Sequence, residues 1–412
     1  MPKCDVAILG AGLGGLAAAA FLSKRNKSVI VLERGPSLSD ALGIVGKAGI
    51  SFSAGPSLSY GFEHGGALQE FAKSLGIVQH TVGPSPCYQV ALPDRRITIS
   101  SSQYETLEEL TREFPKEEQA VTEFYHDLAA LRTKTGKNRV SALLARYRFA
   151  AGFMRKYGFS RELTAFFDVQ ALSFFEKLAG RLSLATLMTL CDTPPRHVLG
   201  GFRKFGDQLY GVILQHGGEI RYNEPAPELI MSDNRAIGIK TAQGLLEADS
   251  ILLNALPQQH RSRLIVGLRE DVIPVGMAED VLMLPDYGSS RDFFMLSFRG
   301  DEEHPGGPKG MKALSVSFQL QQNKPVDKQL LMEQLSRLIP FLKDYVVFAD
   351  EYSSEAGHAV LPAGLKTKPL PPKEGTSVLS RTSSTNVYVL YDKPEAPLQV
   401  ILAVQRYLER LI

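Results

Sequence analysis

The first 33 residues contain two short apolar runs separated by a helix-forming stretch. Residues 6–9 (VAIL) and 28–33 (SVIVLE) are rich in aliphatic side chains, and short runs of this kind are typical of buried strands. Residues 16–25 (LAAAAFLSKR) consist mostly of strong helix formers. The N-terminus is therefore predicted to fold as a strand, a helix and a second strand.

The next part of the chain changes from turns to a long helical region. Residues 52–61 (FSAGPSLSYG) are small and predict turns, and residues 67–77 predict a helix. Residues 88–100 predict a hairpin with a Pro-Asp turn. Amphipathic spacing then predicts an almost wholly helical region over residues 104–190, interrupted at Pro115.

The second half of the chain alternates between the two kinds of pattern. Glycine pairs bracket a predicted helix over residues 200–218, and a strand follows at 219–223. Residues 228–255 predict a meander of three strands that leads into a further apolar strand (SILLNA). Residues 276–370 predict two β segments and one amphipathic helix, and residues 386–412 predict a strand and a helix.

Length and composition limit the class of protein. A chain of 412 residues exceeds one ordinary core, so we expect two domains or one domain with a large insertion. The apolar fraction of 44% and the charged fraction of 22% are ordinary for a soluble protein, and a net charge of +2 gives no indication of nucleic-acid binding. No run reaches about 18 apolar residues, and the N-terminus lacks the basic leader of a signal peptide.

The cysteines add a statement about the cellular compartment. They are three in number and far apart, with no CxxC pair or Cys/His cluster, at Cys4, Cys87 and Cys191. This pattern argues against a disulfide framework and against a zinc site. We therefore expect no metal and a cytoplasmic protein.

A glycine-rich loop follows the first predicted strand. Gly10, Gly12 and Gly15 stand in GxGxxG register, which allows a tight turn, close approach of a pyrophosphate and packing of helix on strand. Glu33 ends the second strand, where a carboxylate accepts hydrogen bonds from a ribose. Its charge favours a free 2′-hydroxyl over a 2′-phosphate, although Arg34 beside it weakens that preference. The alternative is a structural turn that binds no nucleotide.

Residues 140–159 (VSALLARYRFAAGFMRKYGF) combine aromatic and aliphatic side chains with arginine and lysine. Two interpretations remain open. The segment is either part of an ordinary helical core with solvated arginines, or an interfacial helix that meets lipid or frames a channel for an apolar substrate. The second interpretation predicts peripheral membrane contact through residues 140–159.

Four segments occur together in one order: the glycine loop, the AGP at 54–56, the GGF…GGEI block at 200–220 and GIKTAQGLLEADSILLNA at 238–255. Over about half of the chain this combination resembles the FAD-dependent phytoene desaturase-like oxidoreductases, within the flavin amine oxidase and glutathione-reductase-type superfamily. The resemblance implies an α/β fold, with a Rossmann-like FAD-binding domain of three layers and a mostly parallel sheet, and an inserted α+β substrate domain around an apolar tunnel.

The resemblance also implies a division of the chain and a set of cofactor residues. The FAD-binding domain is expected at 1–87, 195–275 and 371–412, and the substrate domain at 88–194, mostly helical, and 276–370. The loop would lie on the FAD pyrophosphate, Glu33 on the adenosine ribose, Ala226 at the adenine, and Gly55 and Pro56 near the flavin. The full set is Gly10, Gly12, Leu13, Gly14, Gly15, Glu33, Arg34, Lys47, Gly55, Pro56, Ala226 and Asp392.

Two segments depart from the family pattern. Residues 38–47 (LSDALGIVGK) replace a Gly-Gly-Arg turn, where Lys47 either supplies the missing charge or is a plain exposed lysine. At the C-terminus, Tyr391 stands where glycine is expected before the acidic Asp392. Pro394 and Pro397 in the following turn remove N–H donors, so this turn cannot copy the usual flavin contact in detail.

No catalytic residue is assigned, because no Ser/His/Asp set, metal cluster or paired carboxylates stand out. His64 is the titratable residue expected nearest the flavin, and Arg196 and His197 precede the glycine pair at 200, but a structural or surface role is the alternative for each. The first functional hypothesis is an FAD-dependent oxidoreductase that transfers hydride between an apolar, isoprenoid or lipid-like substrate and flavin N5. The others are a flavin amine oxidase and a nucleotide-binding scaffold that has lost redox catalysis.

Overall fold

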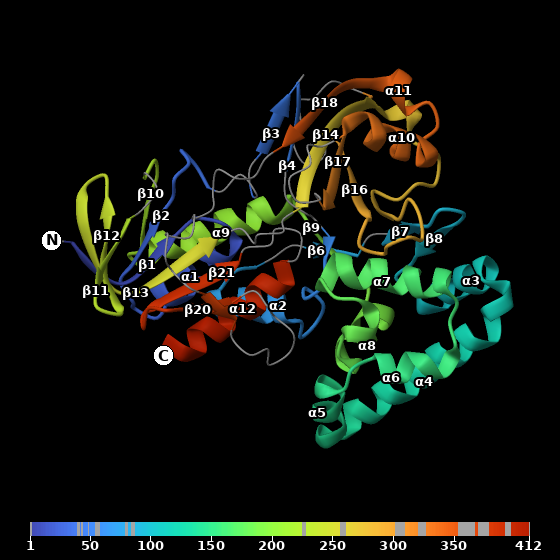
Figure 1. Ribbon diagram of the computed structural model, residues 1–412, viewed down its shortest axis with the longest axis horizontal. Coiled ribbons are helices and arrows are strands. Elements are labelled where there is room, and N and C mark those ends of the chain that lie inside the picture. The colour runs from blue at the N-terminus through green and yellow to red at the C-terminus, as the bar shows by residue number, and fades with distance from the viewer. Residues whose placement is uncertain are drawn as a thin grey trace.

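The structure is a computed structural model, which describes residues 2–38, 42, 44–47, 49–53, 58–78, 81–83, 87–224, 228–255, 261–300, 310–319, 327–352, 367–369, 379–391 and 397–411. Figure 1 shows a large sheet near both chain ends, a second sheet on the other side of the molecule, and an arm of helices below that second sheet. None of the described helices combines the length and apolar character needed to cross a bilayer.

The large sheet has nine strands around a parallel centre. The five central strands, in spatial order, are β10 (Glu219–Arg221), β2 (Val29–Leu32), β1 (Lys3–Leu9), β13 (Gly244–Ala255) and β21 (Val387–Tyr391). Antiparallel strands extend it: β20 (Leu379–Thr382), β19 (Thr367–Pro369), β12 (Arg235–Thr241) and β11 (Glu228–Ser232). The predicted Rossmann-like α/β fold with a mostly parallel sheet is confirmed. The last two strands expected in the 228–255 meander are one continuous strand, β13.

Alternating side chains cover both faces of this sheet. Val6, Ile8 and Val31 point to the face that packs against helices, whereas Leu9 and Leu32 point to the other face. The helices on the first face are α1 (Leu13–Ser23), α9 (Gly201–Gln215) and α12 (Pro397–Leu411), and α2 (Ala67–Leu75) packs on α12. The β11–β12 hairpin contributes apolar side chains to the cluster on the second face.

The second sheet has seven strands and is mostly antiparallel. Its order is β18 (Val346–Tyr352), β14 (Arg261–Arg269), β17 (Met311–Gln319), β16 (Phe294–Arg299), β15 (Asp280–Met283), β7 (Tyr88–Ala91) and β8 (Arg96–Ile99). Two helices contribute to its core, α10 (Lys328–Leu338) and α11 (Leu342–Tyr345).

Strand β14 corrects the predicted division of the chain. Residues 195–275 were expected in the FAD-binding domain, yet β14 pairs with β17 and β18 inside the second sheet. Leu264, Val266 and Leu268 alternate toward the core of that sheet, so their burial is satisfied there and not on the Rossmann-like sheet. The chain therefore leaves the large sheet after Ala255, earlier than residue 276.

The helical arm follows the hairpin β7–β8, as expected for residues 104–190. Its helices are α3 (Gln103–Glu113), α4 (Glu118–Lys137), α5 (Arg139–Tyr147), α6 (Ala151–Met154), α7 (Arg161–Phe175) and α8 (Leu184–Asp192). Residues 140–159 are not one helix, because α5 ends at Arg148, whose extended backbone precedes α6, and Gly158 adopts a left-handed conformation.

Short strands join the sheets and the arm. β3 (Ile44–Lys47) pairs with β4 (Ile50–Ser53), and β9 (Arg196–Val198) pairs with both β5 (Leu58–Ser59) and β6 (Thr81–Val82). The expectation of turns alone over residues 52–61 is therefore wrong at its ends, since β4 and β5 form there through partners that are distant in sequence.

Candidate functional site

The glycine loop lies at the carboxyl edge of the large sheet. Strand β1 ends at Leu9, and Gly10 continues with a φ of 102°, a conformation that favours glycine. Gly12 is the N-cap of α1 without a side-chain cap, and Leu13 is the first helical residue. The first turn of α1 contains no acidic residue. The end of α1 can therefore donate backbone N–H groups to an anion.

Two glycines allow α1 to approach its neighbours closely. A Cβ on Gly15 would lie 2.2 Å from the carbonyl oxygen of Gly10, and a Cβ on Gly14 would lie 2.3 Å from Leu390 Cδ2. The buried Asn254, at the end of β13, is the next neighbour of both positions. Its role was not predicted, because only the pairing of β13 with β1 brings it to the loop.

Glu33 follows β2 at the same edge, since β1 and β2 are parallel. Its side chain is fully buried, at 0% exposure. One carboxylate oxygen accepts the Ala11 N–H at 2.7 Å, and the other accepts the Gly35 N–H at 2.8 Å. Arg34 beside it is exposed. The carboxylate is therefore held against the glycine loop.

These residues fit the ADP half of a dinucleotide. The loop is a cradle that a Cβ at Gly14 or Gly15 would fill, and it ends at an uncapped helix N-terminus suited to a pyrophosphate. Glu33 lies on the neighbouring strand, as the ribose-binding carboxylate does in Rossmann-like folds. Gly10, Gly12 and the start of α1 would hold the phosphates, and Glu33 the ribose.

Other predicted cofactor residues are placed only in part. Gly55, Pro56, Ala226 and Asp392 lie outside the described residues. Lys47 ends β3, and the description covers its backbone alone. Tyr391 pairs with Ala255 at the end of β21, and Pro397 is the first residue of α12. His64 is exposed on the turn before α2.

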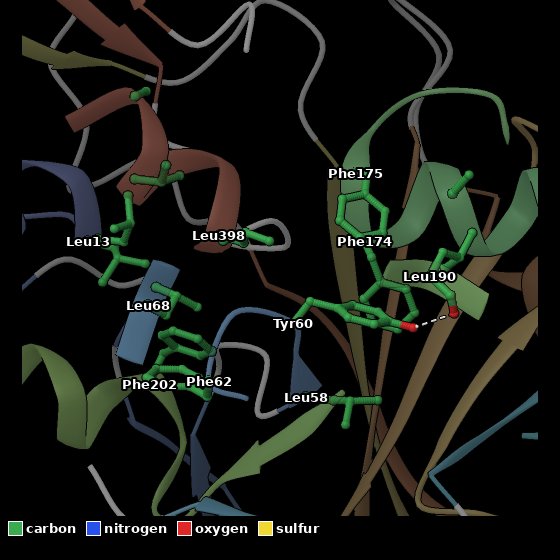
Figure 2. Close-up of a cluster of buried hydrophobic side chains, with 14 of the residues drawn as sticks. Leu13, Leu58, Tyr60, Phe62, Leu68, Phe174, Phe175, Leu190, Phe202 and Leu398 are labelled. Atoms are coloured by element: carbon green, nitrogen blue, oxygen red, sulfur yellow. Dashed lines mark hydrogen bonds between the residues drawn. The ribbon is translucent and has the colours of Figure 1, made fainter. Parts of the chain in front are cut away.

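An apolar cluster extends from the glycine loop to the helical arm (Figure 2). Leu13 and Leu398 lie at one end of it, and Tyr60 lies between them and Phe174 of α7. The Tyr60 ring packs edge-on against Phe174 at 5.0 Å between centroids, and its hydroxyl donates to the Leu190 carbonyl at 3.2 Å. Complete burial raises the pKa of Tyr60, which therefore stays neutral. This junction is dry and lined by aromatic rings.

A buried ionic cluster joins two of the sheets, and sequence reasoning missed all of it except His197. His197 of β9 contacts Asp280 of β15 at 2.9 Å, and Arg299 of β16 contacts the same carboxylate at 3.2 Å. Ser297 donates a further hydrogen bond at 2.5 Å. Burial alone raises the pKa of Asp280, but Arg299 and His197 outweigh burial and hold it at about 2, below the ordinary 3.8.

Replacing Asp280 by asparagine is expected to lower the free energy of unfolding by about 3–5 kcal/mol, because the buried Arg299 guanidinium then faces a neutral amide. Urea denaturation at neutral pH measures this loss. Asp271→Asn is the matched control, since Asp271 pairs with Arg269 at the surface and is expected to change stability by less than about 0.5 kcal/mol.

The same cluster predicts how that loss depends on pH. The pKa of Asp280 is depressed in the folded state, so its stabilisation is complete above the unfolded pKa and is lost as the pH falls toward about 2. The gap between wild type and Asp280→Asn should therefore close progressively below about pH 4. A gap that stays constant down to pH 2 would contradict the ion pairing.

Among the described residues, no group of three His, Cys, Asp or Glu side chains is placed to hold a metal ion. The described site thus consists of the glycine loop, Glu33 and the apolar cluster. With the parallel sheet, these features define a Rossmann-like nucleotide-binding α/β protein. The sequence profile of the NAD(P)-binding Rossmann-like domain matches residues 8–75, which span the loop and Glu33.

More specific similarity comes from carotenoid enzymes. The chloroplastic prolycopene isomerase of Daucus carota is 26% identical over 305 residues, which cover 66% of this chain and 48% of that protein. The neurosporene-forming phytoene desaturase of Rhodobacter capsulatus is 26% identical over 274 residues, which cover 60% of this chain and 52% of that protein. These matches confirm the resemblance to phytoene desaturase-like oxidoreductases. The chain spans about half the length of these relatives.

The fold is similar to solved structures over almost the whole chain. The Rab GDI of Plasmodium falciparum superposes with a TM-score of 0.69 at 13% sequence identity, covering 99% of this chain and 98% of that one. At this level of identity the likeness concerns the fold alone. It supports the arrangement of a Rossmann-like sheet with an additional sheet and a helical arm.

Proposed function

We propose that the protein is an FAD-dependent oxidoreductase of the phytoene desaturase-like type. Its substrate is apolar, of the isoprenoid or lipid-like class, and hydride passes between a substrate carbon and flavin N5. The observation that carries the proposal is the buried Glu33, which accepts the Ala11 N–H at 2.7 Å and so lies beside the glycine loop. The sequence similarity to prolycopene isomerase and phytoene desaturase supports the choice of substrate class.

The chain's own residues bind, orient and exclude water in this proposal. Glu33 would accept hydrogen bonds from the adenosine ribose, and the N-terminus of α1 would hold the pyrophosphate. Bound FAD would supply the redox chemistry. The aromatic junction of Tyr60 and Phe174 supports a dry path for an apolar molecule, because its rings are buried and its hydroxyl group is satisfied internally.

The visible spectrum of the purified protein tests cofactor binding. We expect bands near about 370 and 450 nm, either as purified or after incubation with FAD and removal of the excess. A protein that remains colourless after this incubation would overturn the proposal. Anaerobic bleaching of these bands by isoprenoid substrates, with no bleaching by amines, would favour the desaturase-like activity over an amine oxidase.

A second candidate function is a nucleotide-binding protein without redox catalysis. Pro397 begins α12, so the first residue of that helix has no N–H to donate toward a flavin ring. FAD binding without bleaching by any isoprenoid or amine would favour this candidate. It would act as a scaffold or partner.

A further inference from the structure

Helix α5 presents an apolar stripe to solvent at the tip of the helical arm (Figure 1). Val140, Leu143, Leu144 and Tyr147 have the i, i+3, i+4, i+7 spacing of one helix face. Their exposed fractions are listed in that order as 66%, 52%, 55% and 61%, whereas Ala145 on the opposite face is 3% exposed. A helix of a globular protein normally buries such a stripe. This one packs its opposite side on α4 and α8 and leaves the stripe uncovered among the described residues.

Phe149 extends the apolar surface beyond the end of α5. Its side chain is 70% exposed, although the backbone is held by a β-bridge to Ser183. The ring therefore projects from an ordered segment. We name the surface formed by Val140, Leu143, Leu144, Tyr147 and Phe149 the α5 patch.

The α5 patch lies in the most basic part of the chain. Nine cationic residues and no Asp or Glu occur between Asp127 and Glu162, and they are Arg132, Lys134, Lys137, Arg139, Arg146, Arg148, Arg155, Lys156 and Arg161. The whole protein, with 46 basic and 44 acidic residues, is nearly neutral. The positive charge is therefore concentrated around exposed apolar side chains.

A groove of about 330 Å³ adjoins the patch. Three cationic and two aromatic side chains line it, those of Lys134, Arg148, Lys156, Phe149 and Phe153. The carboxylate at the groove, Asp127, accepts a hydrogen bond from Tyr157 at 2.8 Å. The groove thus combines three cations with an apolar wall, and its volume suits a phosphate-bearing headgroup.

We propose that the α5 patch docks the protein on the surface of an anionic lipid bilayer. The apolar stripe and Phe149 enter the boundary between headgroups and acyl chains, and the surrounding lysines and arginines contact lipid phosphates. The placement of these residues at the tip of the arm allows contact with a flat surface without a clash from either sheet (Figure 1).

A second copy of this chain fits the patch poorly. A two-fold interface brings the same surface of both copies together, so each cationic ring would face another cationic ring. Like charges in an interface are repulsive. A lipid surface with negative phosphates complements both features of the patch at once.

Flotation with vesicles tests the apolar contribution. The wild-type protein is expected to float with vesicles of phosphatidylcholine and about 30% phosphatidylserine, and not with phosphatidylcholine alone. Leu143→Ser with Phe149→Ser should reduce the bound fraction at least about tenfold. Val275→Ser with Leu330→Ser is the matched control, because these apolar side chains are 101% and 52% exposed elsewhere on the surface, and it should bind as wild type does.

A charge variant tests the cations independently of the stripe. Lys134→Gln, Arg148→Gln and Lys156→Gln together should weaken binding about a hundredfold, at about fivefold for each cation. Lys27→Gln, Lys328→Gln and Lys343→Gln remove the same charge from exposed positions elsewhere and should have little effect. Absence of wild-type flotation, or equal flotation of wild type and Leu143→Ser/Phe149→Ser, would overturn the proposal. A change of oligomeric state in that variant with unchanged flotation would assign the patch to a protein interface instead.

Discussion

Replacement of Gly15 by alanine is expected to lower the free energy of unfolding by about 2–3 kcal/mol and to reduce FAD retention at least about tenfold. The added Cβ would lie 2.2 Å from the carbonyl oxygen of Gly10. That atom belongs to the backbone of the loop, so the overlap is relieved only if the loop opens or α1 moves. Urea denaturation and FAD titration of the apoprotein measure the two effects.

Gly211→Ala provides the matched control for this substitution. Gly211 also lies inside a helix, α9, but a Cβ there meets nothing within 4 Å. Because alanine favours a helix interior over glycine, this variant should gain about 0.5–1 kcal/mol in stability and bind FAD as wild type does. If Gly15→Ala is as stable as Gly211→Ala, the close packing of α1 against the loop is contradicted.

The N-terminal unit could be predicted because its signals are local. The apolar runs, the glycine register and Glu33 all fall within 33 residues, and parallel pairing of β1 with β2 brings them to one edge. The same holds for the hairpin β7–β8 and for α9 between its glycine pairs. In each of these segments, backbone preference and burial pattern favour the same structure.

The parts that sequence reasoning missed depend on distant partners. Asp280 is an ordinary acidic residue before a short apolar run, and only the meeting of β15 with β9 and β16 makes it a buried ion-pair partner. The apolar spacing of α5 predicts a helix but cannot say which face packs. Strand β14 has strand character in either sheet, and its neighbours β17 and β18 lie more than 40 residues further along the chain.

The glycine loop itself also depends on the other end of the chain. Gly14 packs against Leu390 of β21 and Val400 of α12, which belong to the last strand and the last helix. The local motif thus acquires its geometry only when the C-terminal segment closes over α1. This contact explains how the unusual residues near 391–397 can influence a phosphate loop nearly 400 residues away.

Replacement of Glu33 by glutamine is expected to raise the dissociation constant for FAD at least about tenfold and to lower the free energy of unfolding by about 1–3 kcal/mol. Glutamine keeps the size of the side chain but has one acceptor oxygen. The N–H groups of Ala11 and Gly35 each donate to a different carboxylate oxygen, so one buried N–H would face an NH₂ group. Titration calorimetry and urea denaturation measure the two changes.

The ligand ADP separates a ribose contact from a purely structural role for Glu33. Because the carboxylate would contact only the adenosine ribose, Glu33→Gln should weaken ADP and FAD by the same factor. Glu228→Gln is the control, since Glu228 is 72% exposed and only 3.5 Å from Lys240 at the surface, and it should change neither quantity. Loss of stability with unchanged affinity for both ligands would mean that Glu33 supports the loop without touching the nucleotide.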